Sequence, residues 1–182
     1  MAAWAGNLVV QEVIQLPDGT LILDPVDGIQ DSFSVRRALA VDSSHIYLES
    51  GARYSYTDAF TCYESFMLTG DFTFTGEGRF GLSFDYNGRT EKNKLIVLDP
   101  NADTMSLAFN EGSTFTTETA AVLDPGETYS FTYIQDGSVG VFYLDGIASL
   151  TVRLYGVSGK TIQFFAENNA IHFNSLREYT RP

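Results

Sequence analysis

The sequence has little of the residue types on which several common kinds of site depend. Its single cysteine, Cys62, excludes a disulfide bond within the chain and is expected to be a small core residue. The two histidines, His45 and His172, stand in no recognisable Ser-His-Asp or Cys-His context. We therefore expect neither histidine to be catalytic.

Basic residues are also scarce, since Lys and Arg number 11 against 23 Asp and Glu, for a formal net charge of −12. This balance disfavours nucleic acid and anionic membranes as partners, because both are bound mainly through clusters of Lys and Arg. Neutral ligands stay open, since carboxylates accept hydrogen bonds from hydroxyl groups and aromatic rings pack on C–H faces. A simpler interpretation is that the charge only keeps the protein soluble.

Helical periodicity and long apolar runs are absent as well. No stretch is apolar at helical spacing, no run is long enough to span a membrane, and residues 1–16 lack the pattern of a signal peptide. Turn signals are abundant instead, with 16 glycines and 44% hydrophobic residues to form a core. The chain is therefore predicted to be all-β. Asp-Gly or Asn-Gly pairs lie at 18–19, 27–28, 87–88, 136–137 and 145–146.

Two of these pairs organise the last third of the chain. Asp136-Gly137 and Asp145-Gly146 are flanked by apolar residues, which is typical of tight hairpin turns with glycine at positive φ. The segment is predicted to be an antiparallel meander. Its expected strands after the first turn are 138–144, 148–154, 161–167 and 170–179.

Earlier segments alternate in the same way. Phe80, Leu82 and Phe84 are expected to face a core, with the intervening residues facing outward. Many short strands with one buried face each predict two packed sheets, a two-sheet antiparallel β-sandwich. The other expected strands are 9–16, 20–23, 37–41, 46–50, 61–75, 79–86, 94–99, 104–109, 115–122 and 128–135.

The meander also resembles a known family. The matching residues are Ser138-Val139, Val141-Phe142, Asp145-Gly146, Leu150-Thr151, Arg153, Tyr155, Phe165 and Ser175-Leu176. They are similar to the end of the C-terminal β-sandwich of glycoside hydrolase family 32, the invertases, levanases and inulinases. The resemblance implies a lectin-like (concanavalin-like) jelly roll. Three positions depart from the family pattern, with Gln135, Asp136 and Gly140 in place of Asp, Arg and Glu.

The beginning of the chain resembles the stretch that closes the catalytic propeller of that family. Glu12, Asp18-Gly19, Leu21 and Pro25-Val26 carry this similarity. We therefore expect residues 1–28 to be a hairpin and linker that follow a catalytic propeller domain, and residues 29–182 to be the sandwich. The resemblance favours an extracellular location through the parent enzyme.

Catalytic motifs of the family are missing. The pairs Asp99-Pro100 and Asp124-Pro125 lack the required neighbours and are typical of turns. A non-catalytic accessory domain without a cofactor is therefore expected. Structural calcium stays a minor alternative, because Asp99, Asn101 and Asp103 have the spacing of a calcium loop but lack the Gly and final Glu of an EF-hand.

Sugar binding is the function that the resemblance implies, through the related levan-binding modules of family 66. These suggest an end-on pocket for terminal fructose, and a chain whose sole tryptophan is Trp4 offers no broad aromatic platform. A furanose pocket needs carboxylates and an arginine to hold adjacent hydroxyls. The candidates are Glu64, Asp85, Tyr86, Arg89, Arg153, Tyr155, Glu167 and Asn168.

Three alternatives stay open at this point. Each candidate also has a structural interpretation; Arg153, for example, is suited to lying over aromatic rings and pairing with a carboxylate. The whole domain has one too, as a sandwich that stabilises the propeller without binding sugar. A complete small glycosidase would require paired carboxylates across a cleft.

Overall fold

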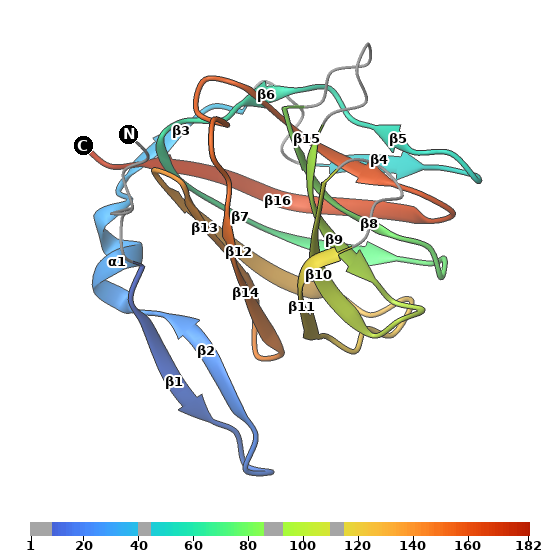
Figure 1. Ribbon diagram of the computed structural model, residues 1–182, viewed down its shortest axis with the longest axis horizontal. Helices are drawn as coiled ribbons and strands as arrows, with labels where there is room; N and C mark the ends of the chain where they lie inside the picture. Colours follow the sequence, from blue (N-terminus) through green and yellow to red (C-terminus); the bar gives the residue numbers. More distant parts are fainter. Residues whose placement is uncertain (1–8, 40–44, 86–92, 110–114) are drawn as a thin grey trace.

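The computed structural model describes residues 9–39, 45–85, 93–109 and 115–182. Two seven-stranded antiparallel sheets pack face to face, and a two-stranded hairpin stands apart from them (Figure 1). The predicted fold class, an all-β two-sheet antiparallel sandwich, is confirmed.

The first sheet, called the β7 sheet, has the order β14-β13-β12-β7-β16-β3, with β4 also paired to β16. It contains both predicted hairpins, and Gly137 and Gly146 have φ values of 59° and 73°, as expected for tight turns. Its strands are β3 (Val35–Arg37), β4 (His45–Glu49), β7 (Ser65–Phe74), β12 (Tyr129–Asp136), β13 (Val139–Leu144), β14 (Ala148–Arg153) and β16 (Ala170–Thr180).

The second sheet, called the β8 sheet, has the order β11-β10-β9-β8-β15-β5, with β6 also paired to β15. The predicted strands 94–99 and 104–109 are reproduced at both ends, whereas the predicted strand 61–75 divides into β6 and β7. Its strands are β5 (Ser55–Tyr56), β6 (Phe60–Thr61), β8 (Phe80–Phe84), β9 (Lys94–Asp99), β10 (Thr104–Phe109), β11 (Phe115–Ala120) and β15 (Thr161–Ala166).

An aromatic core lies between the two sheets. Phe80, Leu82 and Phe84 face it, as their alternation predicts, and all three are at most 1% exposed. Phe164 of β15 stacks on Phe173 of β16 with ring centroids 4.0 Å apart, which joins the two sheets directly. Cys62 is fully buried here, and burial raises the pKa of its thiol to about 12.

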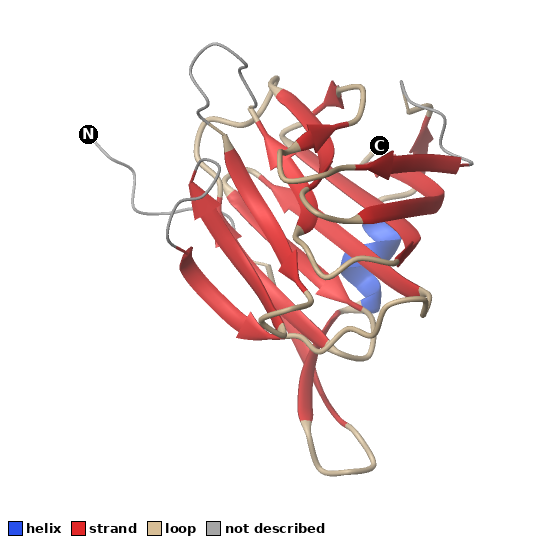
Figure 2. Ribbon diagram, turned by 90° about the vertical axis from the view of Figure 1, so that its right-hand side faces the viewer, coloured by secondary structure: helices blue, strands red, loops and turns tan. Residues whose placement is uncertain are grey.

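Several strands are buried on both faces, which the alternation did not predict. On the outer face of the β7 sheet an apolar cluster contains Met67, Ile134, Val141 and Tyr143, and Phe33 packs against it. Phe33 follows helix α1 (Asp27–Ser32), which Figure 2 shows as the one helix among the described residues. Six residues are too short to leave a periodic pattern, so the sequence predicted no helix. No described helix is long and apolar enough to cross a membrane.

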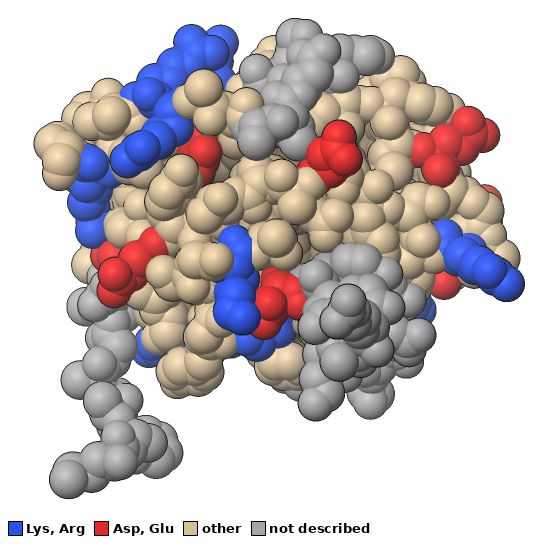
Figure 3. All heavy atoms as spheres, turned by 90° about the horizontal axis from the view of Figure 1, so that it is seen from above, with Lys and Arg blue, Asp and Glu red and all other residues tan. Residues whose placement is uncertain are grey.

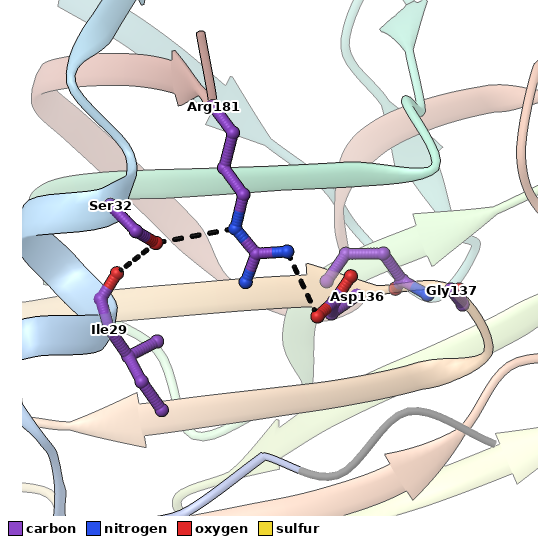
Figure 4. Close-up of polar contacts among 6 residues, drawn as sticks. Ile29, Ser32, Asp136, Gly137 and Arg181 are labelled. Carbon is purple, nitrogen blue, oxygen red and sulfur yellow. Dashed lines mark hydrogen bonds and ion pairs between the residues drawn. The ribbon is translucent and has the colours of Figure 1, made fainter.

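Arg181, close to the C-terminus, ties helix α1 to the β12–β13 turn (Figure 4). Its Nη1 donates to Asp136 Oδ2 at 3.1 Å and its Nε to Ser32 Oγ at 3.2 Å. The guanidinium also lies 4.7 Å from the ring centroid of Phe33. Asp136, one of the departures from the family pattern, therefore has a structural partner in this chain.

The other two departures form a buried contact of their own. The Tyr133 hydroxyl is enclosed in the core and donates a hydrogen bond to Gln135. A Cβ atom at Gly140 would lie 2.5 Å from that hydroxyl oxygen, so the glycine makes the space. Both positions therefore act in the core of this chain rather than at its surface.

The hairpin of β1 (Gln11–Gln15) and β2 (Leu21–Pro25) forms a separate two-stranded sheet that projects from the sandwich (Figure 1). It exposes apolar side chains: Val13 is 61% and Leu21 65% accessible to solvent. Its base contacts the sandwich through a 3.3 Å hydrogen bond from Gln11 Nε2 to the Tyr143 hydroxyl.

Candidate functional site

A polar depression of about 600 Å³ lies at one end of the β8 sheet. Strand β8 begins there, while β9 and β15 end there, and Phe80 pairs with Leu98 and Ala166 of those strands. Antiparallel pairing therefore brings together residues that are far apart in the sequence. The lining residues are Glu77, Gly78, Arg79, Asp99, Asn101, Glu167 and Asn168.

The buried side chain of Asn169 holds the turn that carries Glu77 and Arg79. Its Nδ2 donates to the carbonyl of Gly78 at 2.6 Å, and its Oδ1 accepts the Gly76 N–H at 2.8 Å. Close backbone packing adds to this, because a Cβ atom at Gly78 would lie 1.9 Å from the Glu167 carbonyl oxygen. The two sides of the depression are thus fixed to each other by short backbone contacts.

An ion pair occupies the depression. Arg79 Nε donates to Asp99 Oδ2 at 2.9 Å, and the Asp99 side chain is only 8% exposed. Burial lowers the pKa of the Arg79 guanidinium, but hydrogen bonds with Asp99 and Tyr54 outweigh it and leave the pKa above its ordinary value. Arg79 is therefore a permanently charged donor whose orientation is set by a neighbouring carboxylate.

The chemistry of this set suits hydroxyl groups. Glu77 and Glu167 supply carboxylate acceptors, Arg79 supplies a charged donor, and Asn101 and Asn168 offer amides. Charge-assisted hydrogen bonds are the stronger kind, and a guanidinium beside carboxylates is suited to adjacent hydroxyls. Figure 3 shows one face on which the described acidic and basic side chains form small separate groups rather than one broad patch.

The structure divides the sugar-binding candidates between two ends of the sandwich. Glu167 and Asn168 lie in the depression. Asp85 follows the other end of β8. It lies about 20 Å from Arg79 along the strand, at roughly 3.3 Å per residue. Tyr86 and Arg89 lie outside the described residues.

The opposite end holds the remaining candidates in a looser arrangement. Asp85 Oδ1 lies 3.6 Å from Lys160 Nζ, and both side chains are more than 40% exposed. Lys94 donates to the backbone carbonyl of Tyr155, whose side chain is exposed. Arg153 is exposed as well.

Arg153 and Glu64 complete this end of the molecule. Arg153 Nη1 donates to the Ser138 hydroxyl at 3.4 Å. The Glu64 carbonyl accepts the Gly137 N–H at 2.8 Å, and its side chain is exposed. None of these groups lines the depression at the first end.

Sequence reasoning missed Glu77 and Arg79, and considered Asp99 and Asn101 only as residues of a turn or as calcium ligands. In the structure both Asp99 oxygens are engaged, Oδ2 by Arg79 and Oδ1 by the Ala102 N–H at 3.2 Å. The expected turn is present, with the Ala102 N–H also 3.2 Å from the Asp99 carbonyl. Among the described residues no group of three or more His, Cys, Asp or Glu is arranged to hold a metal ion. The one available signal was the Gly-Glu-Gly turn directly before β8.

Comparisons with known proteins identify the fold. No family model matches the chain, and no curated protein matches it in sequence. Among solved structures it is similar to the carbohydrate binding module CBM66 from Bacillus subtilis, with a TM-score of 0.60 and 15% identity over 74% of this chain and 86% of that one.

Two larger enzymes share the fold over nearly the whole chain. A fructosyltransferase from A. japonicus gives a TM-score of 0.64 and 14% identity over 93% of this chain and 31% of the enzyme. An exo-inulinase from Aspergillus awamori gives 0.62 and 14% over 94% and 34%. The chain thus spans about a third of the length of these enzymes. The resemblance seen in the sequence is confirmed as a likeness of fold.

Proposed function

We propose that this chain is a non-catalytic carbohydrate-binding domain, accessory to a fructan-acting glycoside hydrolase, and that the polar depression binds the sugar. The observation that carries the proposal is the Arg79–Asp99 pair with the carboxylates of Glu77 and Glu167 beside it. The fold shared with a carbohydrate binding module and with fructan-processing enzymes supports the same ligand class.

In this proposal the depression holds a terminal sugar by its hydroxyl groups. Asp99 fixes the plane of the Arg79 guanidinium, which donates to sugar oxygens, while Glu77 and Glu167 accept from sugar hydroxyls. A hydrogen bond to a charged group contributes about 1.5–3 kcal/mol, roughly ten- to a hundredfold in affinity.

Binding of this kind serves a linked catalytic domain. A tethered module keeps the enzyme near the polymer and raises the effective concentration of cleavable bonds. The partners proposed are therefore a fructan or related carbohydrate and a catalytic propeller in the same parent chain. Nucleic acid and membrane are not among the proposed partners. Residues 1–28 are proposed as the linker to that domain.

Affinity electrophoresis and calorimetry test the site. The parent protein should bind levan or inulin in preference to unrelated polysaccharides, and Arg79→Ala should weaken binding at least tenfold. Arg153→Ala is the matched control, because it removes an exposed arginine at the opposite end. Equal binding by Arg79→Ala and the parent would place the sugar elsewhere.

A second candidate function is a structural one, in which the sandwich stabilises the catalytic domain without binding sugar. The observation in its favour is the exposed apolar surface of the β1–β2 hairpin, made by Val13, Leu21 and Leu23. This candidate replaces the first if two results are found together. Fructan in the gel should not slow the migration of the unsubstituted protein, and fusion of the sandwich to the propeller should raise the melting temperature of the propeller.

A further inference from the structure

We infer that the sandwich has a second sugar site on the outer face of the β7 sheet, where a small depression accepts one neutral, hydroxyl-rich sugar residue. The depression has a volume of about 210 Å³. Its polar side chains come from three neighbouring strands and one turn. They are Thr69, Asp71, Ser130, Thr132, Asp145, Ser175 and Arg177.

This depression lies on an uncovered part of the sheet face. Along β7 the core takes Leu68, Gly70 and Phe72, so Thr69 and Asp71 point to the outer face. The neighbouring part of that face carries the apolar cluster covered by Phe33, whereas here the side chains are polar. The change from apolar to polar along one sheet face marks a surface that faces solvent or a ligand.

A β-bulge in β16 aims two side chains at this surface. The pairing with β7 shifts between Asn174 and Arg177, and Ser175 has a φ of 55°. Leu176 turns into the core over Gly70, where an added Cβ atom would lie 2.6 Å from Leu176 Cδ2. Ser175 and Arg177 therefore both reach the outer face, as bulges do when they redirect side chains.

Donors and acceptors converge in the depression. Asp71 Oδ1 accepts the Ser130 hydroxyl at 2.7 Å, and Arg177 pairs with Thr69 across the strands. Partial burial and the nearby carboxylates of Asp24 and Asp71 raise the pKa of Asp145 to about 6. Two carboxylates around one guanidinium disfavour anions and suit adjacent neutral hydroxyls.

The two sites lie on different sheets of the sandwich. Face-to-face sheets are about 10 Å apart, so the sites can engage two segments of a branched polymer or two chains. Linked weak sites gain avidity on a polymer that they lack on a short oligosaccharide. This inference takes the class of ligand from the proposed function. The position of the second site is argued independently of it.

Calorimetry with a short inulin oligosaccharide separates the two sites. The parent protein should bind with a stoichiometry of two, and Arg79→Ala and Arg177→Ala should each leave a stoichiometry of one. Asp71→Asn should weaken the second site at least tenfold, and Arg153→Ala, on the same sheet, should leave both sites unchanged. Unchanged melting temperatures show that the variants remain folded.

Retention by levan in affinity electrophoresis should fall more than tenfold in either single variant, because avidity is lost with one site. A stoichiometry of one that Arg177→Ala and Asp71→Asn leave unchanged would overturn the second site and leave the proposed function standing. Binding that survives Arg79→Ala but disappears in Arg177→Ala would keep the second site and overturn the first. Absence of binding by the parent protein would overturn both.

Discussion

The two ends of the β8 sheet present polar side chains in different ways. At the end with the depression, Arg79 and Asp99 pair at 2.9 Å beside a turn held by the buried Asn169. At the other end, Asp85 and Lys160 lie 3.6 Å apart on exposed side chains. Charged side chains of similar type are therefore suited to binding to different degrees, depending on whether neighbouring groups hold them in place. Side chains that are already held in place lose less conformational freedom when a ligand binds.

The largest expected effect comes from the backbone packing at the anchored end. Gly78→Ala should lower the free energy of unfolding by about 3 kcal/mol or more, because the new Cβ meets a backbone oxygen at 1.9 Å. Gly159→Ala is the control at the opposite end: its φ is 74° and its surroundings are open, so roughly 1–2 kcal/mol is expected. Urea unfolding measures both, and an equal loss would remove the distinction between the ends.

Removal of the Asn169 side chain tests the anchor itself. Asn169→Ala leaves the carbonyl of Gly78 and the N–H of Gly76 without their partner, which should cost about 2–3 kcal/mol of stability and weaken sugar binding. Asn169→Asp retains the acceptor oxygen and should have a smaller effect. Sugar affinity that is unchanged in folded Asn169→Ala would show that the turn does not need this anchor.

A buried carboxyl group, that of Glu178, predicts that the free energy of unfolding depends on pH. Burial raises the pKa of Glu178 from 4.5 to about 7, with a partial lowering by Arg37. The folded protein then keeps a proton that the unfolded chain has released. Stability should be greatest at low pH within this range and should fall as the pH rises from about 4.5 to 7.

Glu178→Gln isolates that contribution. The parent protein should lose about 2 kcal/mol between pH 5 and 8 from this group, and the variant should lose correspondingly less. Chemical denaturation at several pH values provides the measurement. Parallel pH profiles for the two proteins would show that Glu178 does not titrate in this range.

The smallest effect is expected at the exposed pair. Asp85→Asn should change the free energy of unfolding by less than about 0.5 kcal/mol, because exposed ion pairs contribute little. Sugar affinity should also remain within about twofold of the parent value if the anchored depression is the site. A tenfold loss in calorimetry would restore this end as the binding site.

Sequence reasoning succeeded where the determining interactions are local. Asp136-Gly137 and Asp145-Gly146 form tight turns because each pair carries its own conformational preference. The alternation of Phe80, Leu82 and Phe84 identified a core face for the same reason. The short helix α1 was not predicted, because six residues hold too little periodic pattern.

The candidate site shows the limit of that reasoning. Glu167 and Asn168 were identified as candidates through their residue types, but Arg79 was missed because nothing near it in the sequence indicates its partner. Asp99 is twenty residues away along the chain and becomes its partner through the pairing of β8 with β9. Residue type can be read from the sequence directly, whereas the residues that a side chain contacts depend on strand register.

The amino-acid sequence by itself determined the all-β class and the tight turns, since alternation and turn chemistry are properties of short segments. Tertiary structure decided the rest. It covered one part of the outer face of the β7 sheet with Phe33, separated Asp85 from Glu167, and brought Arg79 to Asp99. These outcomes depend on the order and register of strands, which arise from packing two whole sheets against each other.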